Sequence, residues 1–379
     1  MCQFINGRAY KKEELQRDGK YPVLRVGNFF TNDSWYYSDL ELDGDKYCDN
    51  GDLLYAWSAS FAPKIWNGGK VIYHYHIWKI VIDPQHIDKE YLYYFLEWDV
   101  DKIKSSEGNG STMIHVTKGA IEQRALNLPP LSEQRRIAEV LRSVGEAFAI
   151  ASEAFEQAQR TLLLFAEKLL VADAELDGEE KRLGDLIASL DAGVSVNSEG
   201  RPMNGGEFGI LKTSCVSAGV FDPKEHKAVL DNERARVRVQ PTANSIIISR
   251  MNTIDLVGAN AFVAHNHPNL FLPDRLWLLK TNSAARCRWL GYYMKTAKFR
   301  EQIVDIASGT SGSMKNISKG RLAELLLHVP DMQRQDDAIK ILSSVEEIAL
   351  SAWKVLQSHQ KMRKSLSYDL LSGRVRALA

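Results

Sequence analysis

The sequence predicts an α+β fold in which two similar mixed α/β domains are separated by two long antiparallel helices. These helices are expected to form an intramolecular coiled coil with an approximate twofold axis. Two observations predict this fold: matching segments in the two halves of the chain, and a long helical run of apolar residues after each half. The expected segments are a first domain at 1–128, a first long helix at 129–178, a second domain at 179–328 and a second long helix at 329–379.

The internal repeat is clearest near the end of each domain. At an offset of 201 residues, Thr117-Lys118-Gly119 matches Ser318-Lys319-Gly320, and Gln134 matches Gln335. Earlier in each half the offset is smaller, which indicates loop insertions between the matched elements. One match would carry little weight, but an ordered series across both halves indicates a duplicated unit.

Each domain is predicted to contain strands first and a helix near its end. Short apolar runs rich in Val, Ile, Tyr and Trp alternate with Gly, Asn, Asp and Pro, which is the pattern of strands and turns. One helix and one Gly/Ser/Thr loop follow in each copy. The expected strands lie within 23–26, 53–57, 71–82, 210–213, 246–249 and 276–279, the helices at 90–100 and 287–303, and the loops at 105–112 and 308–313.

The long helices are predicted from apolar residues at alternating steps of four and three over about 38 residues each, which is a heptad seam. Because a domain separates the helices, the chain must return, so we expect an antiparallel pair. In the second helix His359 and Arg363 interrupt the seam, and we expect them to reach solvent or to fix the register. Packing of each helix mainly on its own domain is the alternative. The seam residues are Ile137, Leu141, Val144, Phe148, Phe155, Leu162, Leu342, Val345, Leu356 and Leu366.

Composition is that of an ordinary globular chain, with 45% apolar and 25% charged residues. No apolar run is long enough to span a bilayer. The four cysteines, Cys2, Cys48, Cys215 and Cys287, are far apart, which suits a reducing cytoplasm. We therefore expect a cytoplasmic protein.

The charge distribution is uneven although Lys plus Arg and Asp plus Glu both number 48. A net charge of zero argues, by itself, against a nucleic-acid-binding protein. However, residues 201–321 contain 18 basic and 9 acidic residues, and residues 129–200 contain 7 basic and 14 acidic ones. A basic block next to an acidic block is typical of a phosphate-facing domain joined to a helix that faces away from DNA. The slightly acidic first domain does not fit this pattern.

Motifs for catalysis are missing from the sequence. The string from Gly309 to Lys315 has the wrong spacing for a phosphate-binding loop. There is no glycine fingerprint for a methyl donor and no Asn/Asp-Pro-Pro-aromatic adenine pocket. His74 and His76 are expected to share one face of a strand, and a zinc site would need two further ligands. The sequence therefore predicts no catalytic residue, no metal and no cofactor in this chain.

The chain resembles the specificity subunit of type I restriction-modification systems. The resemblance is carried by the segment from Leu128 to Ala138, LPPLSEQRRIA, by Asn6-Gly7-Arg8-Ala9-Tyr10, by YPVLRV at 21–26 and by LLSGRVR at 370–376. It extends over essentially the whole chain. The second unit opens with RLGDL at 182–186, a usual start in that family, whereas the first unit has no counterpart before Phe4. We expect the opening segment of the first unit to be missing or to start upstream.

This resemblance implies that each mixed domain is a target recognition domain that reads one half of a split double-stranded DNA site. It implies that the helices set the spacing and dock two methyltransferase subunits, which restriction and motor subunits join. S-adenosylmethionine, ATP and Mg are then expected on those partners, in a system for DNA methylation and phage defence. Apolar helix positions outside the seam would supply the docking surface, including Ala138, Val140, Leu163, Leu164 and Ile348.

Candidate DNA contacts are polar side chains on loops held by strands, because Lys and Arg bind phosphates and forked side chains read base edges. Lys118 and Lys319 stand out because both copies keep them. In the first domain the candidates are Asn6, Arg8, Arg25, Asn28, Ser58, Ser60, Lys64, Lys70, His74, Lys104, Asn109, Ser111, Thr112 and Lys118. In the second domain they are Lys212, Thr213, Ser214, Arg250, Asn252, Thr253, Arg275, Thr310, Ser311, Lys315, Asn316 and Lys319.

Two other functions remain open at the level of the sequence. One is a stand-alone DNA methyltransferase or nuclease, against which the lack of donor and metal motifs speaks. The other is an architectural coiled-coil protein whose end domains bind protein. Modification of DNA by the purified chain would identify the first, and mass measurement with binding to random duplex DNA would identify the second.

Overall fold

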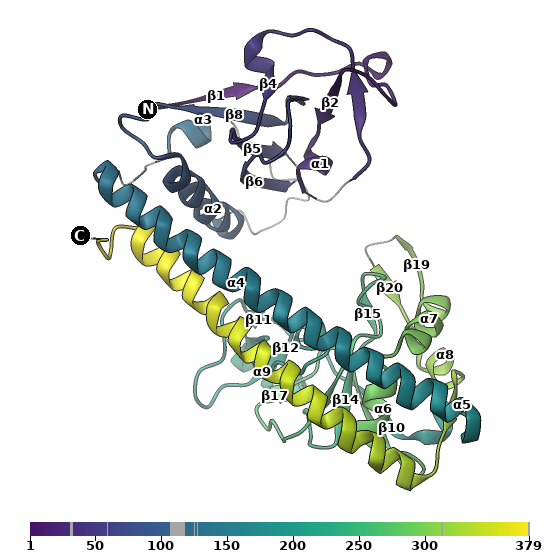
Figure 1. The fold of residues 1–379 in the computed structure, drawn as a ribbon. Coiled ribbons are helices and arrows are strands. Elements are labelled where there is room, and N and C mark those ends of the chain that lie inside the picture. Colours follow the sequence, from purple (N-terminus) through teal and green to yellow (C-terminus); the bar gives the residue numbers. More distant parts are fainter. Residues whose placement is uncertain are drawn as a thin grey trace. The chain divides into compact units, whose positions relative to one another are not determined.

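The computed structural model describes residues 1–30, 33–58, 60–106, 118–124, 126, 128–311 and 314–377. The chain forms two compact units, one of residues Met1–Ala151 with Leu356–Ala379 and one of Ser152–Val355. Each unit holds one mixed α/β domain and a segment of each long helix (Figure 1). The predicted α+β fold is thereby confirmed.

The first domain contains two four-stranded sheets. One is antiparallel, and in the other β2 and β7 run parallel. The order in the first sheet is β1 (Cys2–Asn6), β8 (Ile77–Ile82), β5 (Leu53–Ser58) and β6 (Ser60–Ile65). The order in the second is β3 (Tyr36–Ser38), β2 (Tyr21–Leu24), β7 (Val71–Tyr73) and β4 (Tyr47–Cys48). The helices are α1 (Val26–Phe30), α2 (Lys89–Ser106) and α3 (Lys118–Glu122).

The second domain repeats this plan and adds two small sheets. Its antiparallel sheet has the order β10 (Ile187–Ala192), β18 (Leu276–Thr281), β14 (Ser245–Ser249) and β16 (Asn260–Val263). Its second sheet has the order β11 (Ser198–Glu199), β13 (His226–Val229), β12 (Gly209–Leu211) and β17 (Leu270–Phe271). The added strands are β15 (Met251–Asn252), β20 (Met314–Asn316) and β19 (Ser308–Ser311), and the pair β21 (Leu326–Val329) and β9 (Glu179–Arg182). The helices are α5 (Asp173–Asp177), α6 (Cys287–Tyr293), α7 (Ala297–Ile306) and α8 (Lys319–Ala323).

The topology of the two domains shows the duplication directly. The sheet order β1-β8-β5-β6 corresponds to β10-β18-β14-β16, and the parallel pair β2·β7 corresponds to β12·β17. Both central strands, β5 and β14, are almost entirely buried, because helices cover one face of the sheet and the second sheet covers the other. Their apolar sequences, LLYAWS and SIIIS, suit burial on both faces.

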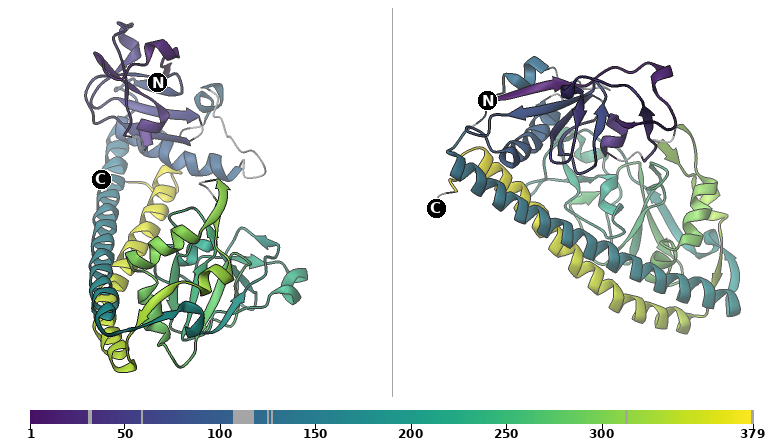
Figure 2. Two further views of the ribbon diagram at one scale, coloured as in Figure 1. Left: turned by 90° about the vertical axis from the view of Figure 1, so that its right-hand side faces the viewer. Right: turned by 45° about the horizontal axis from the view of Figure 1, so that its top comes forward.

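The long helices are α4 (Leu131–Ala166) and α9 (Met332–Leu371), and α4 continues as a π-helical turn, Glu167–Ala172. In the first unit Ile137 packs in one core with Leu370, and the Arg363 guanidinium lies 5.7 Å from the Phe148 ring centre. In the second unit the Phe155 and Trp353 rings are 4.9 Å apart, and α4 and α9 lie side by side in both views of Figure 2. As the residue number increases along α4, its contacts on α9 have decreasing residue numbers. The two helix segments within each unit therefore run antiparallel.

The seam residues occupy the covered faces of both helices. Val144, Phe148, Val345 and Leu366 are half-buried. The other six are at most 9% exposed, namely Ile137, Leu141, Phe155, Leu162, Leu342 and Leu356. Several of them also contact the domain of their own unit: Ile137 and Leu141 share a core with α2, and Leu162 and Leu342 share one with α6. The two packing modes weighed from the sequence therefore coexist. Arg363 forms a salt bridge with Glu97 of α2 at 2.8 Å, so one of the two polar residues that interrupt the seam contacts the domain of the first unit.

Three local expectations are wrong. His74 and His76 do not alternate in a strand but lie in the turn between β7 and β8. Residues 308–313 were expected as a loop, but 308–311 form strand β19. The single helix expected at 287–303 is two helices, because the Thr296 side chain accepts a hydrogen bond from the backbone of Phe299 and begins α7.

Candidate nucleic-acid interface

Strand ends bring part of the candidate set together in the first unit. Strand β8 lies between β1 and β5 in the sheet, and Asn6 lies opposite Trp78. The backbone N–H of Trp57 donates to the carbonyl of His76 at 3.1 Å. Arg8 and His74 form an isolated parallel β-bridge through their backbones, and the N–H of His74 donates to the carbonyl of Leu24 at 2.9 Å. We call the resulting cluster the first polar edge, which consists of Asn6, Arg8, Arg25, Ser58 and residues 74–76.

The two arginines of the first polar edge differ in their partners. Arg8 donates to both carboxylate oxygens of Glu14 at 2.9 and 2.7 Å, and its guanidinium lies 5.3 Å from the Tyr10 ring centre. Hydrogen bonds from Arg8 and from the Lys11 backbone lower the pKa of Glu14 to about 2. Arg25 lies 4.3 Å from the Tyr36 ring centre and has no ion pair with any described residue. Arg25 is therefore the freer cation for a phosphate.

His74 stands out because it is held neutral. Burial, with His76 and Arg25 nearby, lowers the pKa of His74 to about 4. Its ring stacks on Tyr10 at 6.3 Å and lies 4.8 Å from the His76 ring. A neutral imidazole offers one donor and one acceptor, which is the chemistry of reading a base edge rather than a phosphate.

Aromatic side chains at this edge were missed as candidates. Tyr75 is 39% exposed, and its ring lies 3.9 Å from His76 and 6.2 Å from Trp57. Such rings are surfaces on which a base can stack. The Tyr73-His74-Tyr75-His76 string by itself predicts a continuous strand, which conceals the exposed turn between β7 and β8.

The remaining candidates of the first unit lie elsewhere. Asn28 is buried and donates to the Ser34 carbonyl at 2.8 Å. Lys64 donates to the Phe29 carbonyl at 2.9 Å, and Lys70, just before β7, lies 4.3 Å from the Tyr47 ring centre. Lys118 begins α3 and is 3.7 Å from Glu122. The side chains of Ser60 and Lys104, and the whole of Asn109, Ser111 and Thr112, lie outside the described residues.

The second unit gathers its candidates around β15, β20 and the end of β14. Arg250 follows β14 and donates to the Asp274 carbonyl at 2.6 Å and to Asn316 at 3.3 Å. Its own N–H donates to the carbonyl of Arg275 at 3.0 Å, and Asn252 pairs with Lys315 across the strands. We call Arg250, Asn252, Arg275, Lys315 and Asn316 the second polar edge. Arg275 is exposed and has no ion pair with any described residue.

Five further candidates of the second unit have other surroundings. Ser214 donates to Glu225 at 2.5 Å and Lys212 lies 3.5 Å from the same carboxylate, which lowers the pKa of Glu225. Thr213 precedes Ser214 in the same 3-10 turn. The N–H of Thr253 donates to Asn252 at 2.9 Å. Lys319 donates to the Leu190 carbonyl, which indicates a structural role at the end of the domain. The side chains of Thr310 and Ser311 lie outside the described ones.

A pair of glycines positions both edges, and sequence reasoning did not single them out. The N–H groups of Gly7 and Gly193 donate to the carbonyls of Ile77 and Leu276 at 3.2 and 3.4 Å. A Cβ on Gly7 would overlap the carbonyl oxygen of Tyr73, and one on Gly193 would overlap that of Leu272. Only glycine therefore allows this close approach at matching places in the two domains.

The apolar positions expected to dock partners differ in exposure. Ala138 is 2% exposed and belongs to the core of the first unit, so it is unavailable for docking; Val140 is half-buried against that core. Leu163, Leu164 and Ile348 are 37%, 73% and 65% exposed. On α9, Ile341, Ile348 and Val355 recur every seven residues and are 45%, 65% and 47% exposed. We call these three residues the α9 stripe.

None of the described helices is long and apolar enough to cross a membrane. The described side chains likewise contain no group of three or more His, Cys, Asp or Glu residues placed to hold a metal ion.

Comparison with known proteins adds to this geometry. Residues 1–159 match the family model for the type I restriction modification DNA specificity domain. The chain is 26% identical over 175 residues to the type I restriction enzyme EcoBI specificity subunit of Escherichia coli, covering 45% of this chain and 36% of that protein. It is 21% identical over 373 residues to the EcoKI specificity subunit of Escherichia coli strain K12, covering 89% and 78%.

The match to the EcoBI subunit thus spans about a third of that relative's length (36%), and the match to the EcoKI subunit spans 78%. Among solved structures, the type I restriction-modification S subunit from M. genitalium has a similar fold, with a TM-score of 0.52, 16% sequence identity and coverage of 98% of this chain and 93% of that one. Residues 1–159 therefore match a type I restriction modification DNA specificity domain, and the fold of the M. genitalium S subunit extends over nearly the whole chain.

Proposed function

We propose that this chain is the DNA sequence-specificity subunit of a type I restriction-modification complex, in which each domain reads one half of a bipartite site in double-stranded DNA. The observation that carries the proposal is the repetition of one DNA specificity domain. Residues 1–159 match that domain, and the second domain repeats its sheet topology and its glycine-supported polar edge. Two similar readers on one chain suit a site made of two half-sites.

The polar edges are the proposed reading surfaces. Arg25 and Arg275 are cations without a carboxylate partner among the described residues, as phosphate contacts require. The neutral His74 and the amide of Asn252 offer donors and acceptors to base edges. Phosphate contacts would fix the register of the duplex, and the neutral groups would supply the discrimination.

The long helices are proposed to set the spacing between half-sites and to dock two methyltransferase subunits, which restriction and motor subunits join. The α9 stripe is the proposed docking surface, because three large apolar side chains at heptad spacing suit a partner helix. S-adenosylmethionine, ATP and Mg would be held by these partners. The chain itself would act in the cytoplasm as a non-catalytic subunit.

The proposal is tested by mapping methylated adenines in cells that contain the methyltransferase subunits with or without this chain. A single bipartite motif, present only with this chain, is the expected result. Insertion of one heptad into both helices should then lengthen the spacer of that motif without changing its half-sites. Modification by the purified chain alone, or an unchanged spacer after the insertion, would contradict the proposal.

A further inference from the structure

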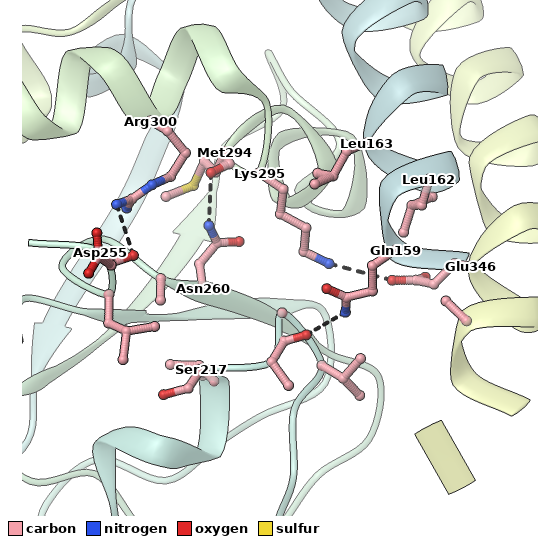
Figure 3. A pocket seen from close by; sticks show the side chains of 17 residues that line it. Gln159, Leu162, Leu163, Ser217, Asp255, Asn260, Met294, Lys295, Arg300 and Glu346 are labelled. Carbon is pink, nitrogen blue, oxygen red and sulfur yellow. Dashed lines mark hydrogen bonds and ion pairs between the residues drawn. The ribbon is translucent and has the colours of Figure 1, made fainter. Parts of the chain in front are cut away.

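The second unit contains a pocket between its long-helix segments and its domain (Figure 3). Its volume is about 170 Å³, comparable to a cavity of about 150 Å³ that binds benzene in another protein. Apolar walls come from Leu162, Met294 and Ala349 among others. None of its lining residues belongs to the second polar edge, so the pocket is a separate site and does not depend on the proposed function.

Asn260 places an unsatisfied acceptor in this pocket. The residue is 3% exposed, and its amide nitrogen donates to the carbonyls of Met294 at 3.0 Å and Gly258 at 3.4 Å. These two bonds fix the orientation of the amide, and its oxygen has no hydrogen-bond partner among the described residues. Figure 3 shows that oxygen on the side of the pocket where Lys295 and Gln159 lie. A buried acceptor without a donor is unfavourable, so a ligand N–H is favoured here.

Lys295 places a donor in the same pocket. Its ammonium forms an ion pair with one oxygen of Glu346 at 3.6 Å, and the other Glu346 oxygen accepts from Arg288 at 2.8 Å and Tyr292 at 2.7 Å. The Lys295 side chain is 13% exposed, and burial lowers its pKa. An ammonium carries three N–H groups, so this single ion pair leaves N–H groups for an acceptor within the pocket.

Gln159 supplies a second acceptor from α4. Its amide nitrogen donates to the Ala218 carbonyl at 2.5 Å, which leaves its oxygen on the pocket side (Figure 3). The pocket thus presents two amide oxygens and one ammonium between apolar walls. The complementary group has two N–H donors and one carbonyl acceptor, as in –NH–CO–NH–, and the apolar walls and the volume suit a single flat ring.

We propose that this pocket binds a small cyclic ureide, whose N–H groups donate to Asn260 and Gln159 and whose carbonyl accepts from Lys295. The ligand would contact α4, α9 and the domain of the second unit at once. Bound ligand should therefore stabilise this unit, since it binds the folded state only.

The test uses the full chain and uracil as the probe, with 1,3-dimethyluracil as the matched control ring that lacks both N–H donors. Calorimetry or ligand-observed NMR at millimolar concentrations should detect uracil, and the dimethyl ring should bind about tenfold more weakly or less. No binding of uracil, or equal binding of both rings, overturns the proposal.

Variants locate the bound ring. Asn260→Leu and Lys295→Met should each weaken uracil binding by about tenfold. Lys298→Met, three residues along and outside the pocket, should bind uracil like the unmodified chain. Unchanged binding in both pocket variants would place the ring elsewhere and overturn the assignment. Should either variant fail to fold, the two rings on the unmodified chain still decide.

Discussion

Gln134 and Gln335 make the same hydrogen bonds at matching places in the two units. The side-chain oxygen of Gln134 accepts from the Asp88 backbone at 2.8 Å, and that of Gln335 accepts from the Arg286 backbone at 2.8 Å. Each amide nitrogen donates to the proline carbonyl five residues earlier, at 2.8 and 2.9 Å, and to a second carbonyl in the domain. Each glutamine therefore locks the start of a long helix to the start of a domain helix.

Replacing either glutamine by leucine should destabilise its own unit. Both side chains are buried, at 1% and 0% exposure, so Gln134→Leu and Gln335→Leu leave backbone groups unpaired. The expected cost is about 1–3 kcal/mol each. Urea unfolding, with hydrogen exchange to assign the affected unit, measures it. Gln360→Leu, at an exposed position of α9, is the control, and equal stability of all three variants would refute the lock.

The close approach of Gly7 and Gly193 predicts intolerance of alanine. A Cβ at either position overlaps a backbone carbonyl oxygen, so Gly7→Ala and Gly193→Ala must shift the strand ends that carry the polar edges. We expect a loss of about 1–3 kcal/mol of unfolding free energy and weaker binding to the cognate duplex. Gly69→Ala and Gly200→Ala, whose Cβ atoms would meet nothing within 4 Å, are the controls. Wild-type stability of both edge variants would show that the strands adapt.

His74 predicts a dependence of stability on pH. Its folded pKa of about 4 lies below the ordinary value of 6.5, so between these values only the unfolded chain takes up the proton. The unfolding free energy should therefore fall as pH falls from 6.5 towards 4, and not change through this group above 6.5. His74→Gln should reduce that slope in urea titrations at several pH values. His86→Gln, at a side chain that is 60% exposed, is the comparison. A slope unchanged by His74→Gln would contradict the assignment.

Arg275 is predicted to bind a phosphate. Arg275→Ala should weaken binding to cognate and random duplexes alike and reduce the salt slope of log K by about 1. Fluorescence anisotropy at a series of salt concentrations measures both effects. Lys298→Ala provides a control cation that pairs with Glu175. A loss confined to the cognate duplex would instead assign Arg275 to a base.

The α9 stripe predicts where partners dock. Ile348→Asp should reduce co-purification of methyltransferase subunits by about tenfold, since a charge in an apolar contact is unfavourable. The thermal stability of the chain alone should not change, because Ile348 is 65% exposed. Gln360→Asp introduces the same charge at another exposed position of the helix. Equal loss of partner in both variants would point to net charge rather than to the stripe.

The fold was predictable where burial imposes a recognisable pattern of apolar residues on the sequence. The runs at 53–57 and 246–249 fall within β5 and β14, because a strand buried on both faces is apolar throughout. The heptad seam likewise marked α4 and α9. Strand β19 was missed because its sequence, SGTS, has no apolar alternation, and its pairing with β20 defines it. The break before α7 depends on the Thr296 cap, which a continuous apolar pattern conceals.

The candidate site was predictable only in its residue types. Arg250, Arg275 and Lys315 were singled out as cations, but their proximity comes from strand pairing between distant segments. Lys212 and Lys319 were equally plausible as phosphate contacts. In the structure, however, the Lys212 ammonium pairs with the Glu225 carboxylate and the Lys319 ammonium donates to the Leu190 carbonyl. The glutamine locks were visible as repeat matches, but their hydrogen bonds join each helix to a segment about fifty residues away.

The division of both long helices between the units has a consequence for folding during synthesis. Residues Ser152–Val355 are contiguous, so the second unit can assemble as soon as they leave the ribosome. The first unit needs Leu366 and Leu370 to cover Ile137 and Leu141, and these are translated more than two hundred residues later. Until then the first half of the nascent chain has a partly exposed apolar helix face, and such transiently exposed surfaces favour aggregation.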